Sequence, residues 1–60
     1  MTPESLLAWR ERLKLSRTEA ARRLGLARNT YRAYEAGKRP VPETVALACA
    51  AIAYGLPPAP

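Results

Sequence analysis

The feature that most constrains this chain is a glycine, Gly25, that separates two short segments with helical periodicity. The apolar positions of the first segment, about residues 17 to 24, recur at helical spacing. Its inward face is expected to hold Ala20, Ala21 and Leu24. Gly25 stands where a helix C-terminus favours a left-handed residue, and the second segment runs from about residue 28 to 36. Because Ala21 and Gly25 form a small i, i+4 pair, we expect the two helices to cross closely at a short turn.

The second of these helices has two chemically different faces. Tyr31 and Tyr34 have the spacing of a buried stripe, and we expect them in the core rather than stacked on bases. On the opposite face, an arginine fork matches guanine and a carboxamide matches adenine in the DNA major groove. The predicted DNA base contacts are Arg28, Asn29, Arg32 and Ala33. Arg28 and Arg32 could instead turn to a phosphate, so that alternative stays open.

The spacing of this region resembles the helix-turn-helix of the phage Cro and repressor class, also called the XRE family. The positions that match are Ala21, Gly25, Leu26, Tyr31, Tyr34, Glu35, Gly37, Lys38, Arg39 and Pro40. The resemblance covers roughly residues 6 to 52. Ala27 departs from the family pattern, where a serine cap is common, and Tyr31 fits an apolar or aromatic position but departs from the valine or isoleucine that is usual there. It implies an all-α fold of four main helices, like that of lambda repressor, and double-stranded DNA as the partner.

Composition narrows the class of function. The chain has 60 residues, a net charge of +5 and a pI near 10.2, which favours a polyanionic partner over a merely basic, soluble surface. With no histidine and one cysteine, we expect no disulfide, no metal, no cofactor and no enzyme activity. We expect one domain over residues 1–56 and a proline-rich tail over 57–60. A domain of this size buries only about 60% of its unfolded surface, so a second subunit or DNA is expected to support it.

A further helix is predicted from the Thr2-Pro3-Glu4 start to about Lys14. One of its faces carries Leu6, Trp9, Arg10 and Leu13. Arg10 is the odd member, because a charge on an apolar face needs a partner. The resemblance implies a structural ion pair between Arg10 and Glu35. A solvated Arg10, paired with Glu4 or Glu11, is the alternative.

A second set of residues is predicted to contact the DNA backbone. Ser16 and Glu19 form a capping box that starts the helix at Arg17, and the resemblance places this arginine against the backbone. Ala27 provides no side-chain cap, so the N–H groups of the next helix are free for a phosphate or for water. Residues 38–42 form a stiff basic loop because of its prolines. The predicted backbone contacts are Arg17, Thr30, Lys38 and Arg39. A solvated arginine and a solvated loop remain alternatives.

The last predicted helix, from Pro42 or Glu43 to Tyr54, is apolar on nearly all sides. Its core stripe is expected to hold Val45, Cys49 and Ile52. A second apolar stripe is left over in a domain with one core, and this stripe is the predicted homodimer interface. It consists of Leu47, Ala50, Ala51 and Tyr54. The segment from Arg39 to the end also looks like the C-terminal part of small anti-CRISPR-associated repressors, which dimerise through their last helix.

These observations together predict a dimeric repressor of its own or a phage operon, bound to an inverted-repeat operator in the cytoplasm. A protein-binding module, such as an antitoxin or adaptor that grips a partner through the last helix, is the alternative from another class. We expect no membrane association, because the apolar run from Val45 to Tyr54 is far short of the ~20 residues of a bilayer span. Charges in the first residues also argue against a secretory signal.

Overall fold

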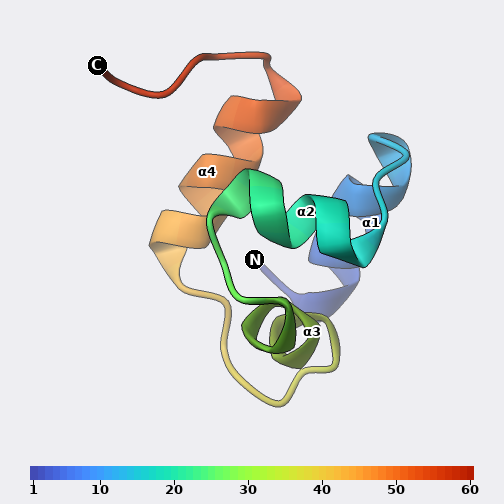
Figure 1. The fold of residues 1–60 in the computed structure, drawn as a ribbon. Helices are drawn as coiled ribbons and strands as arrows, with labels where there is room; N and C mark the ends of the chain where they lie inside the picture. The colour runs from blue at the N-terminus through green and yellow to red at the C-terminus, as the bar shows by residue number, and fades with distance from the viewer.

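The computed structural model describes residues 1–60 and contains four helices and no strand (Figure 1). The helices are α1 (Pro3–Arg12), α2 (Arg17–Leu24), α3 (Arg28–Glu35) and α4 (Glu43–Ala53). The predicted all-α class with four main helices is therefore confirmed. None of the four has the length and apolar character that crossing a membrane requires.

The ends of α1 show one cap that the sequence indicated and one that it did not. Thr2 caps the start, and Ser5 completes a capping box in which each residue's backbone N–H meets the other's hydroxyl, at 2.9 and 3.0 Å. The helix ends at Arg12, before the predicted Lys14, because Lys14 adopts a left-handed conformation with φ of 58°. Such a conformation costs a residue with a Cβ roughly 1–2 kcal/mol, so a lysine gives no sequence signal for it.

The turn between α2 and α3 has the geometry that Gly25 predicts. The Ser16–Glu19 capping box starts α2, with both hydrogen bonds present at 2.9 and 3.1 Å. Gly25 has φ of 70°, and the next amide, that of Leu26, donates to the Ala21 carbonyl at 2.9 Å. Figure 1 shows α3 almost end-on beneath α2, so the two helices cross steeply. Ala21 is 2% exposed, which is what close packing at this crossing requires.

The core is a single cluster to which every helix contributes. It consists of Leu6, Trp9, Ala20, Ala21, Tyr31, Tyr34, Val45 and Cys49. The Trp9 indole N–H donates to the Cys49 carbonyl at 2.9 Å, which satisfies a buried polar group and ties α1 to α4. Burial raises the pKa of the Cys49 thiol to about 11, so the thiol is protonated and acts as a small apolar core residue, as predicted.

The C-terminal tail follows directly from the end of α4. Gly55 has φ of 73°, and the Leu56 amide donates to the Ala51 carbonyl at 2.9 Å, which terminates the helix. From Leu56 to Pro60 the chain is exposed and extends away from the helices (Figure 1).

Candidate nucleic-acid interface

Glu35, the last residue of α3, accepts hydrogen bonds from three side chains. Arg10 donates through Nε to Oε2 at 2.7 Å and through Nη2 to Oε1 at 3.4 Å. The Tyr31 hydroxyl donates to Oε2 at 2.6 Å, and Arg17 Nε donates to Oε1 at 3.2 Å. The Glu35 side chain is only 8% exposed, so these donors replace the water that burial removes.

The electrostatics of this cluster favour an ionised Glu35. Burial alone would raise the pKa of Glu35, but hydrogen bonds from Arg10, Tyr31 and Arg17 outweigh it, and the net shift is downward. The pKa of Arg10 is raised, chiefly by its hydrogen bond to Glu35. Burial, followed by the hydrogen bond to Glu35, raises the pKa of Tyr31 well above its usual range. Glu35 therefore carries a fixed negative charge that two arginines and the neutral Tyr31 hydroxyl stabilise.

The ion pair implied for Arg10 is present, and Arg10 pairs with Glu35 rather than with Glu4 or Glu11. The Arg10 side chain is 14% exposed, and its Nη1 also donates to the Leu15 carbonyl at 3.1 Å. This arginine thus fixes the α1–α2 connection as well as the end of α3. The result is a scaffold that holds α3 from its inner side.

Arg17 has a contact that the sequence did not indicate. It was predicted at the DNA backbone, and in the structure its Nε bonds to Glu35 while the side chain remains 59% exposed. An arginine has five N–H donors, so the outer nitrogens stay available to a phosphate. No local pattern indicates this contact, because Arg17 and Glu35 are 18 positions apart in the sequence.

The outer side of α3 carries most of the predicted base contacts around one hollow. This hollow has a volume of about 300 Å³. It is lined by Asn29, Arg32, Ala33, Ala36 and Lys38. Three of the four predicted base contacts are therefore brought together, whereas Arg28 is exposed but outside the lining. No acidic side chain lines the hollow, so its cations face an open, electropositive space.

The two cations of the loop after α3, Lys38 and Arg39, have different surroundings. Gly37 has φ of 75°, and the Lys38 amide donates to the Ala33 carbonyl at 3.0 Å, so Lys38 is attached to the last turn of α3. The Arg39 guanidinium instead lies over the Tyr34 ring, 5.8 Å from its centroid. Sequence reasoning grouped both with the backbone contacts, together with the half-buried Thr30 on α3. Of these residues, only Lys38 lines the hollow with the predicted base contacts.

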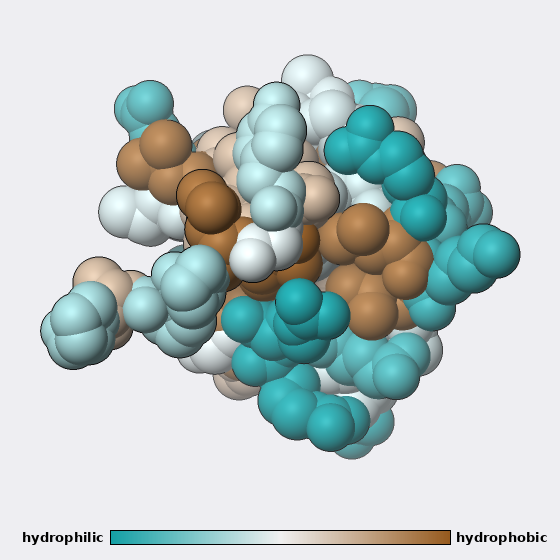
Figure 2. Space-filling model, turned by 90° about the horizontal axis from the view of Figure 1, so that it is seen from above, coloured by the Kyte–Doolittle hydropathy of each residue, from teal (hydrophilic) through white to brown (hydrophobic).

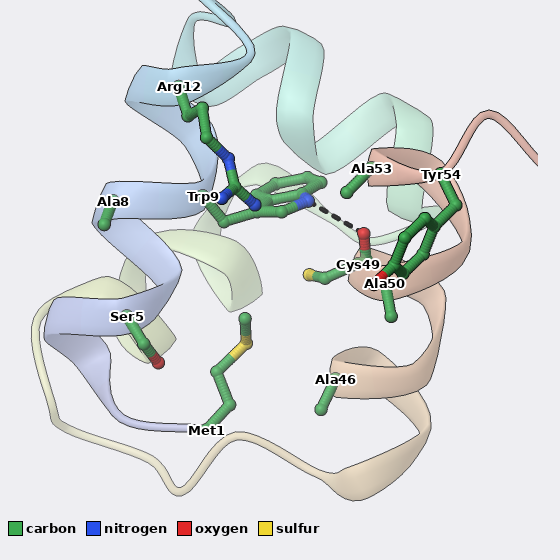
Figure 3. Close-up of a pocket in the computed structure, with 10 residues that line it drawn as sticks. All are labelled: Met1, Ser5, Ala8, Trp9, Arg12, Ala46, Cys49, Ala50, Ala53 and Tyr54. Carbon is green, nitrogen blue, oxygen red and sulfur yellow. Dashed lines mark hydrogen bonds between the residues drawn. The ribbon is translucent and has the colours of Figure 1, made fainter.

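An apolar groove of about 700 Å³ lies on another side of the molecule, between α1 and α4 (Figure 3). It is lined by Met1, Ser5, Ala8, Trp9, Arg12, Ala46, Cys49, Ala50, Ala53 and Tyr54. Figure 3 shows Met1 pointing into the space between the helices, with Tyr54 at the far end of α4. Seen from above, the molecule exposes apolar patches beside strongly hydrophilic ones (Figure 2).

The predicted dimer stripe on α4 is largely open to solvent. Leu47 is 65% and Tyr54 is 82% exposed, and Ala50 is exposed as well. Ala51 is the exception, because it is half-buried on the side of α4 that turns toward the core. The core stripe of α4 lies as predicted, with Val45 and Cys49 buried and Ile52 partly buried against them.

A comparison with known protein families bears on this geometry. The model of a family described as a helix-turn-helix domain matches residues 5–60, which is nearly the whole chain. A search of curated proteins and a search of solved structures each found no match. The match covers the α2–turn–α3 unit, the Glu35 cluster and the whole of α4.

Proposed function

Since the chain belongs to a family of helix-turn-helix domains within the XRE-like group, we propose that it is a sequence-specific transcription regulator that binds double-stranded DNA. The observation that carries this proposal is the hollow on the outer side of α3. There an amide and two cations, from Asn29, Arg32 and Lys38, face solvent without an acidic neighbour. The major groove offers the acceptors and donors that such side chains match.

The proposed recognition helix is α3, whose outer side enters the major groove. An α-helix with its side chains is about 10–12 Å across, close to the width of that groove. The proposed base contacts are Arg28, Asn29, Arg32 and Ala33. The proposed backbone contacts are Arg17, Thr30 and Arg39, with the uncapped N–H groups at the start of α3. Lys38, predicted from the sequence as a fourth backbone contact, lines the hollow with Asn29 and Arg32.

We further propose that the regulator is a homodimeric repressor, acting in the cytoplasm on its own or a phage operon. The exposed α4 stripe supports this, because Leu47 and Tyr54 leave a large apolar area in water. A symmetric dimer through this stripe would present two copies of α3 about 34 Å apart, one turn of DNA. It would repress by occluding the promoter, and its operator would be an inverted repeat.

Selection of bound sites from a random duplex pool tests this function with the full chain. We expect enrichment of an inverted repeat whose half-sites are about 10 base pairs apart, centre to centre. A pool that stays random after selection would contradict sequence-specific binding. Enrichment of a single half-site would support sequence-specific DNA binding and contradict binding as a dimer.

Light scattering of a matched pair of variants tests the dimer directly. Leu47→Glu adds a charge to the exposed α4 stripe and should give a monomer with weakened operator binding. Leu7→Glu makes the same change at an exposed position of α1 outside the groove lining, and should leave the dimer intact. A parent protein that is monomeric at micromolar concentration, with and without DNA, would contradict the dimer.

The groove between α1 and α4 supports a second candidate, an antitoxin or adaptor that grips a partner protein through α4. Salt dependence separates the two functions. DNA binding by several phosphate contacts weakens steeply with salt, whereas an apolar protein contact does not. Affinity for duplex DNA that is weak and unselective at low salt would favour this candidate.

A further inference from the structure

Lys38 belongs to the recognition helix by its backbone, although it lies beyond the last helical residue. The amides of Ala36, Gly37 and Lys38 donate to the carbonyls of Arg32, Tyr34 and Ala33, at 2.9, 3.2 and 3.0 Å. The left-handed Gly37, with φ of 75°, lets the chain close back on the helix end in this way. The Cα of Lys38 is therefore held rigidly relative to the outer side of α3.

The side chain of Lys38 shares its surroundings with the proposed base-reading residues. It lines the same hollow as Asn29, Arg32 and Ala33, and it is exposed. If α3 enters the major groove with Asn29 and Arg32 toward the bases, this hollow closes over the base edges. An ammonium group there meets the O6 and N7 acceptors of guanine, which lysine and arginine both match.

Arg39 differs from Lys38 in its surroundings, and this difference separates a base contact from a phosphate contact. It is the next residue and carries the same charge, yet its guanidinium lies over the Tyr34 ring at 5.8 Å and it does not line the hollow. Its charge is thereby held at the rim of the domain, where a phosphate can reach it. The loop thus divides its two cations between two environments.

We propose that Lys38 is a specificity-determining residue that reads a guanine in the major groove beyond the base pairs read by Asn29 and Arg32. This proposal rests on the DNA binding proposed above. Along the outer side of α3 the order is Asn29, then Arg32, then Lys38 at the C-terminal end. The base pair read by Lys38 should therefore lie on the far side of the Arg32 position from the one read by Asn29.

The test compares Lys38→Ala with Arg39→Ala, two substitutions that remove the same charge from adjacent positions. Each variant, with the parent, is titrated against the selected operator and a panel of its single-base-pair changes, at several salt concentrations. We expect Lys38→Ala to relax the preference at one base pair per half-site by about 5- to 150-fold, the range of a good base contact. Arg39→Ala should weaken every sequence by a similar factor and leave the preferences unchanged.

The panel also separates this proposal from the function on which it rests. If Lys38→Ala weakens all sequences equally, as Arg39→Ala should, Lys38 is a phosphate contact and the proposal fails while sequence-specific binding stands. A parent without preference for any duplex would overturn both. Thermal unfolding by circular dichroism confirms that each variant is folded, which is expected because Lys38 and Arg39 are exposed.

Discussion

On its inner side α3 presents Glu35 to three donors, from Arg10, Arg17 and Tyr31, whereas on its outer side Arg32 and Lys38 border a hollow that no acidic side chain lines. Arg10 and Glu35 are paired and mostly buried and join α1 to α3, and the more exposed Arg17 adds a link to α2. The outer charges have no acidic partner within the chain. The same residue types thus stabilise the fold where their partners lie within the chain, and are available to a ligand where no internal partner exists.

Substitution of Glu35 on the inner side of α3 should have the largest effect on stability. Glu35→Gln leaves the Arg10 charge buried without its carboxylate, which typically costs roughly 3–5 kcal/mol in the free energy of unfolding. Urea unfolding of both proteins measures the difference. Glu11→Gln, at an exposed position on α1, is the control and should stay within about 0.5 kcal/mol of the parent. Equal stability of Glu35→Gln and the parent would mean that the cluster does not hold the helices.

Substitution of Asn29 on the outer side of α3 should weaken DNA binding and leave the fold intact. Asn29→Ala removes the carboxamide from the hollow, and we expect a loss of about 1–3 kcal/mol on the preferred site with relaxed choice at one base pair per half-site. Because Asn29 is exposed, the unfolding free energy should change little. Binding to a panel of single-base-pair changes is the measurement. A variant that keeps the parent's full sequence preference would show that α3 is not read in this way.

The inner side should also be the part that is sensitive to acid. The pKa of Glu35 is lowered in the folded state, so its contribution to stability is fully present above the ordinary value of 4.5 and is lost as the pH falls through the folded pKa. Protonation of Glu35 removes the same negative charge as Glu35→Gln, so the stability of the parent should fall toward that of the variant as the pH is lowered. Unfolding free energies of parent and variant, measured down the acid range, should converge. Parallel curves would place the acid sensitivity elsewhere.

The features of the fold that depend on residues close together in the sequence could be predicted from the sequence. The capping box of Ser16 and Glu19 and the left-handed Gly25 depend on neighbours in the sequence, and the sequence predicts them correctly. Burial of Tyr31 and Tyr34 follows from helical periodicity, which is also local. The left-handed Lys14 was missed, because residue type does not favour it. Its conformation goes with the hydrogen bonds that close the end of α1, in which the Leu15 amide donates to the Arg10 carbonyl at 3.1 Å.

The less predictable features of the site join segments that are distant in the chain. Arg17 reaches Glu35 only because α2 crosses α3, and the position of Lys38 in the hollow depends on how the loop closes on α3. The Arg10–Glu35 pair is equally distant, and it was anticipated through resemblance rather than through spacing. The side-chain type thus indicates that a cation will pair with a carboxylate or with DNA. Tertiary packing determines which of the two partners it has.

Arg17 stands between the two sides, and its substitution should have the smallest effect on stability and a specific effect on binding. Its Nε bonds to Glu35 at 3.2 Å, but the side chain is 59% exposed, so solvent screens the pair and Arg17→Ala should cost less than about 1 kcal/mol of unfolding free energy. If its outer nitrogens also hold a phosphate, the salt slope of operator binding should flatten by about one unit, with all sequences weakened alike. Arg23→Ala removes the same charge from an exposed position of α2, and it is the matched control whose slope should stay at the parent's value. An Arg17→Ala protein that loses stability and keeps the parent's salt slope would place Arg17 wholly with the inner cluster.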